Sequence, residues 1–408
     1  MSTDRKRSTF ALLALALSAF AIGTTEFISV GLLPMIAEDL DISVTTAGLT
    51  VSIYALGVMF GAPVLTSLTS NMSRKSLLLW IMVVFIAGNL MAAMAGTVGL
   101  LLIARVVSAL AHGIFMAIGA TIAADLVPSH KRASAIAIMF TGLTVATVTG
   151  VPFGTFIGQL FGWRFAFFTI VIIGVIALIG NSILVPSDLP KGARTTFGDQ
   201  LKLVTNGRLL LVFIITALGY GGTFVVFTYL SPLLQEVTGF KSGTVTLILL
   251  VYGLAIAAGN TIGGKLSNRN PINALFYMFL IQAVILMVLT FTAPFKVAGL
   301  ITILLMGLFA FMNVPGLQVY VVMLAERFVP SAVDVASAIN IAAFNAGIAL
   351  GAYFGGLIAD SMGLIHTAWA GGLMVFAAVI LTGWSRLLER KSLSKEMPLH
   401  PVQDTQLG

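Results

Sequence analysis

The chain is a succession of long apolar runs separated by short polar or turn-rich breaks. The hydrocarbon core of a bilayer is about 30 Å thick, so a crossing helix needs about 20 apolar residues. Runs of that length occur twelve times. The pattern predicts an all-α membrane protein with transmembrane helices at 10–36, 44–69, 76–97, 99–126, 132–159, 164–185, 209–236, 243–267, 272–293, 297–324, 333–360 and 364–386.

The longest polar interruption divides these runs into two sets of six. It reads PSDLPKGARTTFGDQLKLVTNGR and resembles no membrane span. We therefore expect four parts along the chain. These are an N-terminal six-helix bundle (1–185), a cytoplasmic linker (186–208), a C-terminal six-helix bundle (209–390) and a cytoplasmic tail (391–408).

The two sets of runs repeat each other. Matching residues recur at nearly one offset, which drifts by a few positions through loop changes. Two parallel halves related by an axis along the membrane normal form a transporter architecture, so the repeat predicts two pseudo-symmetric bundles. The matches are Pro34 with Pro232, Tyr54 with Tyr252 and Gly61 with Gly259 at 198, and Gly150 with Gly351, Gly154 with Gly355 and Gly162 with Gly363 at 201.

Composition supports the same class. Of the 408 residues 58% are hydrophobic and 9% are charged, whereas soluble domains carry about 25% charged residues. The absence of cysteine excludes disulfides and thiolate metal sites. The net charge of +7 comes from basic residues scattered in short loops, which argues against nucleic-acid binding. A cytoplasmic N-terminus places eighteen of the 22 basic residues inside and three outside, so we expect both termini in the cytoplasm.

Two loops, TSLTSNMSRK after the second span and GKLSNRNP after the eighth, resemble the signature of the major facilitator superfamily. The family's loop between spans 2 and 3 reads G-x-L-x-D-R-x-G-R-K. Here TSLTSNMSRK keeps Leu68, Arg74 and Lys75, while the equivalent loop of the second half, GKLSNRNP, keeps Gly264, Leu266 and Arg269. Both copies depart from the pattern at other positions. The resemblance covers nearly the whole chain and implies two six-helix bundles.

Three longer stretches are more specific: GTTEFISVGLLPMIAEDL, ARVVSALAHGIFMAIGATIAADLVPSHKRASA and GVPFGTFIGQLFGWR. They resemble a narrower branch of that superfamily, the sugar-efflux and arabinose-efflux permeases among the drug:proton antiporters. The resemblance implies proton-coupled export across a bacterial inner membrane, energised by the proton gradient without a cofactor or metal. We expect a monomer whose partners are a small-molecule substrate, protons and the lipid bilayer.

Glu26 is the acidic residue that lies deepest in an apolar run. A helix rises about 1.5 Å per residue, which places Glu26 roughly 24 Å from Phe10 and about 12 Å short of Pro34. Ionisable residues in membranes are costly and tend to mark transport pathways. Arg105 lies at a similar depth in 99–126, and His112 follows on the same helix face. We expect Glu26 to carry the coupling proton, with Arg105 and His112 setting its pKa.

A second reading stays open. Glu26 and Arg105 could form a structural ion pair between two helices, and the protein would then be a facilitator that needs no proton. An enzyme is not expected, because the sequence contains no HExxH motif and no pair of intramembrane acids. The second half contributes no deep charge, which favours a small neutral or amphipathic substrate, either sugar-like or a drug.

The remaining predictions concern gating and substrate contacts. Asp125 ends one span near the basic residues Arg74 and Lys75, and we expect these three to form an inner gate. Glycines at four- and eight-residue steps on 132–159 and 333–360 predict close helix packing. The stretch GYGGTF could break the span 209–236. The candidate substrate contacts are Tyr54, Phe224, Tyr229, Tyr252, Asn313 and Asn345.

Overall fold

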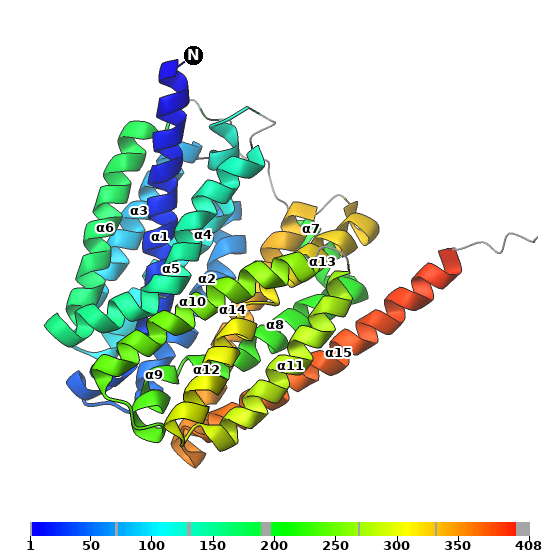
Figure 1. The fold of residues 1–408 in the computed structure, drawn as a ribbon. Coiled ribbons are helices and arrows are strands. Elements are labelled where there is room, and N and C mark those ends of the chain that lie inside the picture. The colour runs from blue at the N-terminus through cyan, green and yellow to red at the C-terminus, as the bar shows by residue number, and fades with distance from the viewer. Residues whose placement is uncertain are drawn as a thin grey trace, which may run out of the picture.

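The regular elements of the computed structural model are all helices (Figure 1). Twelve helical segments are long and apolar enough to cross a membrane, which confirms the predicted all-α membrane fold. The structure describes residues 2–69, 72–128, 132–187, 189, 197–267, 270–330 and 333–396.

The N-terminal half consists of six long helices. Within it α1 packs on α5, α2 packs on α4, and α3 packs on α6, and their buried apolar side chains form one core. The helices are α1 (Ser2–Asp39), α2 (Val44–Leu68), α3 (Arg74–Ala93), α4 (Val98–Asp125), α5 (Arg132–Phe161) and α6 (Trp163–Leu184).

The C-terminal half repeats these pairings. Here α8 packs on α14, α10 on α12, and α11 on α15, around a second apolar core. Figure 1 shows this half beside the first, with the two helical sets side by side. Its elements are α8 (Gly207–Phe227), α9 (Leu230–Pro232), a π-helical turn (Leu233–Val237), α10 (Ser242–Ser267), α11 (Pro271–Thr292), α12 (Lys296–Ala310), α13 (Val314–Phe328), α14 (Val333–Met362) and α15 (His366–Glu396).

Two glycine turns explain one of the matches in the sequence repeat, that of Gly162 with Gly363. Gly162 joins α5 to α6 with φ of 88°, and Gly363 joins α14 to α15 with φ of 101°. A positive φ is strained for a residue that has a side chain, whereas glycine adopts it readily. Each half therefore uses the same turn at the same place.

The segment between the halves contains one short helix. The last helix of the N-terminal half ends at Leu184, α7 (Phe197–Thr205) follows, and α8 begins at Gly207. Residues 188 and 190–196 of the predicted linker lie outside the described residues, as do residues 397–408 of the predicted tail. The described part of that tail, up to Glu396, continues α15 as helix.

The glycine faces predicted from spacing lie at close helix contacts. A Cβ on Gly142 would lie 1.8 Å from the carbonyl oxygen of Ala16, so α5 can approach α1 only with glycine there. On α14, a Cβ on Gly351 would lie 2.1 Å from the carbonyl oxygen of Gly221 on α8. Small residues let membrane helices pack backbone to backbone. The first contact lies within the N-terminal half and the second within the C-terminal half, so each one holds its own bundle together.

The expected break at GYGGTF is wrong. The helix α8 runs without interruption to Phe227, and the chain leaves the helix at Thr228 and Tyr229. The glycines serve packing instead: a Cβ on Gly222 would lie 2.7 Å from the carbonyl oxygen of Gly371 on α15. Neighbouring helices therefore hold this glycine-rich segment in helical form.

The span expected at 297–324 is discontinuous. Residues Phe311 to Asn313 form a turn between α12 and α13, and Pro315 stands in the first turn of α13. The facing helix α10 approaches closely there, because a Cβ on Gly263 would lie 1.9 Å from the carbonyl oxygen of Met312. In transporters, non-helical backbone at membrane depth lies next to protein or a cavity.

Hydrogen bonds join the two halves at the ends of the spans where α1 finishes, which we call the distal side. The Thr45 hydroxyl donates to Asp360 Oδ1 at 2.6 Å and lies 3.1 Å from the carbonyl of Gly356. The amide of Gln159 donates to the carbonyl of Ser242 at 2.8 Å. At the opposite side, the start of α1 and the end of α15 lie far apart (Figure 1).

Candidate transport site

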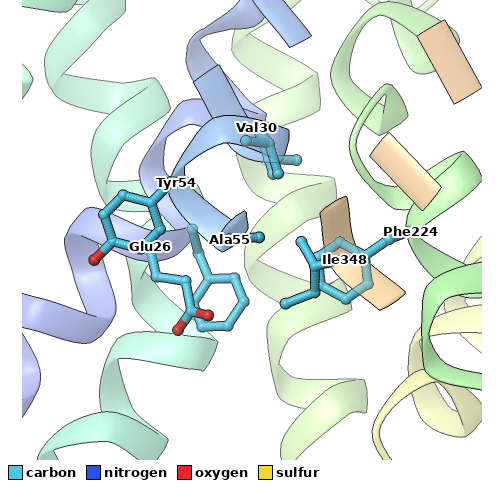
Figure 2. A pocket seen from close by; sticks show the side chains of 8 residues that line it. Glu26, Val30, Tyr54, Ala55, Phe224 and Ile348 are labelled. Atoms are coloured by element: carbon cyan, nitrogen blue, oxygen red, sulfur yellow. The ribbon is translucent and has the colours of Figure 1, made fainter. Parts of the chain in front are cut away.

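Glu26 lines a cavity between the two halves. The other lining residues come from α1, α2, α8 and α14. The cavity volume is about 10 Å³, roughly the space that one water molecule needs, so the cavity is narrow in this conformation. Figure 2 shows Glu26 beside Tyr54, facing Phe224 and Ile348 of the other half. Within the described part of the chain, the Glu26 carboxylate makes no hydrogen bond or ion pair.

Arg105 is held by backbone rather than by a carboxylate. Its side chain is 1% exposed, and its guanidinium donates to the carbonyls of Thr50 at 3.1 Å and Thr25 at 2.8 Å. A third contact, at 3.5 Å, reaches the backbone carbonyl of Glu26. The guanidinium also lies 4.0 Å from the centre of the Tyr54 ring, a favourable cation–π arrangement. Arg105 therefore fastens α4 to α1 and α2.

His112 completes a polar cluster on the far side of Tyr54. The Tyr54 hydroxyl lies 3.1 Å from His112 Nδ1, and His112 is 4% exposed. In Figure 2 the Tyr54 hydroxyl points away from Phe224 and Ile348. Arg105 lies within electrostatic range of both Glu26 and His112. Glu26 and His112 thus both lie near Arg105 and Tyr54. His112 contacts Tyr54 and not Glu26.

An aromatic cluster in the C-terminal half includes Phe224, which lines the cavity opposite Glu26. The Tyr220 ring centre lies 5.0 Å from that of Phe224, 5.3 Å from that of Phe311 and 4.9 Å from that of Phe344. Phe27 of the first half reaches Phe311 at 6.1 Å. Tyr220 lies within electrostatic range of Glu26. Edge-to-face rings at these distances form a rigid apolar wall, to which a ligand's apolar face could dock.

The geometry therefore places one carboxylate, which has no partner among the described residues, in a narrow cavity between two repeated six-helix halves. The model of the Major Facilitator Superfamily matches residues 15–327 of the sequence. The chain belongs to this superfamily. The resemblance seen in the sequence motifs is thus confirmed, and the protein is a multi-pass membrane transporter.

Relatives of this transporter cover nearly all of its length. It is 78% identical over 391 residues to the uncharacterized MFS-type transporter YtbD of Bacillus subtilis, which spans 96% of this chain and 99% of the relative. It is 38% identical over 373 residues to the inner membrane transport protein YdhP of Escherichia coli K12, covering 91% and 95%.

The fold is also that of solved transporters. The crystal structure of a D-xylose–proton symporter superimposes with a TM-score of 0.73, covering 92% of this chain and 97% of that one, at 17% identity. At that identity the likeness concerns the fold alone. It agrees with the twelve spans and the repeated halves.

Of the six predicted substrate contacts, two line the cavity, Tyr54 and Phe224. The other four are not among the residues that line it. Tyr229 lies at the distal side, where its hydroxyl donates to the carbonyl of Ala352 at 3.0 Å. Tyr252 stacks on Phe227, 5.5 Å between ring centres.

Three of the predicted contacts carry buried oxygens that have no hydrogen-bond partner among the described residues. They are the Tyr252 hydroxyl and the amide oxygens of Asn313 and Asn345. Both asparagines use their amide nitrogen within their own chain segment, Asn313 on the carbonyl of Ala310 and Asn345 on that of Ile341. Unpaired buried oxygens are uncommon, so these positions stay candidates for contacts with a polar ligand.

Arg74 and Asp125 form the ion pair expected from their position. The Arg74 guanidinium contacts Asp125 Oδ2, joining α3 to α4. Lys75 makes no ion pair with a described residue. Both partners belong to the N-terminal half, so the pair alone does not connect the two bundles. It also coexists with hydrogen bonds that join the halves at the distal side, and the gating role stays a prediction.

Sequence reasoning identified Phe224 but missed the rings that pack with it, Tyr220, Phe311 and Phe344. Tyr220 lies in the glycine-rich stretch that was interpreted as a helix break. Phe311 stands two residues before Asn313, within FMNVPG. The proline and glycine of that stretch are signals for a helix boundary, and they could have pointed to Phe311 as a residue displayed at the break. Phe344 carries no such local signal.

Proposed function

We propose that this transporter is a proton-coupled efflux antiporter for a small neutral or amphipathic solute, sugar-like or a drug. It would work by alternating access in a bacterial inner membrane, with both termini and the linker in the cytoplasm. It would need no cofactor beyond the proton gradient. The printed name of YdhP, an inner membrane transport protein, and the resemblance to efflux permeases support this assignment.

The observation that carries the proposal is the position of Glu26. A coupling group must reach the solvent path and must exchange its proton without breaking the fold. Glu26 lines the cavity and makes no hydrogen bond or ion pair with the described part of the protein. The alternative function, a facilitator, assumes a structural ion pair between Glu26 and Arg105. In such a pair the carboxylate would accept hydrogen bonds from the guanidinium.

Arg105 supplies a fixed positive charge for this cycle. Guanidinium groups stay protonated in proteins, and this one is fastened to backbone carbonyls of α1 and α2. A charged Glu26 is attracted toward Arg105, whereas a protonated Glu26 is not. Protonation would therefore change how strongly α1 is drawn toward α4. The aromatic wall around Tyr220 would meanwhile hold the apolar face of the solute.

The test measures proton movement in proteoliposomes. Vesicles containing the pH dye pyranine are loaded with L-arabinose or with the neutral drug chloramphenicol and diluted into solute-free buffer. Solute leaving through an antiporter brings protons in, so the wild type should acidify the interior. Glu26→Gln removes the titratable group while preserving shape, and should abolish acidification while solute counterflow continues.

The matched control is Asp39→Asn, on the same helix. Asp39 lies outside the cavity, where it accepts hydrogen bonds from Arg164 at 2.6 Å and Trp163 at 3.1 Å. This variant should acidify like the wild type. If Glu26→Gln still couples solute exit to acidification, Glu26 is not the proton carrier. If the wild type exchanges solute without any proton movement, the facilitator is the correct function.

A further inference from the structure

A groove on the outer surface of the C-terminal half lies where the linker enters α8. It lies between α8, α13 and α15, and its volume is about 520 Å³. Most of its lining is apolar, and several of these side chains are well exposed, Trp384 to 54% and Ile214 to 41%. The apolar lining residues include Leu210, Ile214, Phe328, Trp384 and Leu388.

A basic residue stands at the end of this groove. Arg208 lines it and donates to Glu389 Oε2 at 2.5 Å, while its Nε is buried without a hydrogen-bond partner among the described residues. Arg327 donates to the other oxygen of Glu389 at 3.2 Å. Two guanidinium groups thus donate to one carboxylate, so Arg208 shares the negative charge of Glu389 with a second arginine.

This combination is amphipathic in the same sense as a phospholipid. The apolar lining suits an acyl chain, and a phosphate diester would supply a negative charge and a hydrogen-bond acceptor for Arg208 beside the shared Glu389. Hydrogen bonds between guanidinium and phosphate are strong and can be bidentate. Tryptophan is enriched at the membrane–water interface, and basic pockets between membrane helices on the cytoplasmic side bind anionic headgroups.

We propose that the groove between α8, α13 and α15 is a binding site for an anionic phospholipid, with the phosphate on Arg208 and an acyl chain along Ile214 and Trp384. On the predicted orientation the lipid belongs to the cytoplasmic leaflet. The site lies outside the cavity of Glu26, so lipid binding does not depend on the proposed transport cycle.

The experiment compares lipid retention by the full-length protein. Purified protein is equilibrated with an equal mixture of phosphatidylglycerol and phosphatidylcholine of identical chains, and retained lipids are counted by native mass spectrometry. The wild type should retain phosphatidylglycerol preferentially. Arg208→Gln should reduce that preference about fivefold, which corresponds to ~1 kcal/mol for one basic residue near an anionic surface.

Two further variants separate this site from general surface charge and from misfolding. Arg386→Gln removes a charge from α15, the helix that carries Glu389; Arg386 lies over Phe276 and outside the groove, so this variant should keep the preference. Ile214→Trp fills the groove without touching the core and should lower retention of both lipids.

Three results would overturn the proposal. The wild type could retain both lipids equally, or Arg386→Gln could lose as much preference as Arg208→Gln. Glycerol 3-phosphate could displace the bound lipid at concentrations comparable with the lipid itself, which would assign Arg208 to a soluble phosphate.

Discussion

At the scale of single residues, Arg105 organises the N-terminal half of the site. Its fork-shaped guanidinium reaches carbonyls on α1 and α2 from its place on α4, and the Tyr54 ring covers one face. Carbonyl oxygens have two lone pairs, so those of Thr25 and Thr50 can accept from Arg105 besides their helical partners. The buried charge is thereby solvated by backbone, which leaves the Glu26 carboxylate available to the cavity.

We predict that Arg105→Lys destabilises the protein much more than Arg164→Lys. An ammonium group cannot reproduce several directional bonds from one fork, and each lost hydrogen bond to a charged group costs about 1.5–3 kcal/mol. Arg164 also donates to one backbone carbonyl, that of Ala95 at 2.9 Å, but it pairs with Asp39 at a solvent-accessible site, side chain 35% accessible, where an ion pair contributes about 0–1 kcal/mol. Thermal unfolding in detergent measures both variants, and equal shifts would contradict this account of Arg105.

The candidate site could be predicted from sequence only in part. Glu26 was identifiable because a carboxylate in an apolar run conflicts with the hydrocarbon around it. The sequence could not show that Arg105 is held by backbone carbonyls instead of the Glu26 carboxylate, because every residue carries a carbonyl. The contact of His112 with Tyr54 joins residues 58 positions apart, and nothing local in the sequence encodes it.

At the scale of helices, hydropathy located the twelve spans because length and apolar composition are local properties. The helix breaks were harder to predict. Glycines in GYGGTF suggested an interruption, but close contacts with α14 and α15 keep α8 helical. The real breaks, at Thr228 and at Phe311 to Asn313, follow from tertiary packing as well as from Pro232 and Pro315 nearby. Composition alone cannot distinguish a glycine that breaks a helix from one that lets a neighbour approach.

We predict that Gly351→Ala destabilises the C-terminal bundle, whereas Gly99→Ala does not. The new methyl group at Gly351 would lie 2.1 Å from the Gly221 carbonyl oxygen, so α14 must move away from α8. Overpacking of this kind costs about 1–3 kcal/mol. Gly99 begins a helix with nothing within 4 Å of its added methyl group, and alanine there favours the helix. Thermal midpoints of the purified variants decide the matter, and an unshifted midpoint for Gly351→Ala would refute the close contact.

At the scale of the whole molecule, alternating access requires the halves to separate at the distal side, where hydrogen bonds now join them. Thr45 of α2 and Asp360 of α14 lie 2.6 Å apart at their side-chain oxygens. The natural chain contains no cysteine, so a pair introduced at these two positions can be cross-linked selectively. We predict that joining Thr45→Cys to Asp360→Cys with a short thiol-specific reagent blocks most of the pyranine-detected transport, and that a cleavable reagent restores it on reduction.

The matched control joins Asp39→Cys to Arg164→Cys, which are also at the distal side but both in the N-terminal half. Because that link holds α1 to α6 within one bundle, it should leave transport unchanged. Wild-type transport by the cross-linked Thr45–Asp360 pair would show that the distal contacts do not open during the cycle, and a block by both links would show that rigidity within one half, rather than closure between halves, limits transport.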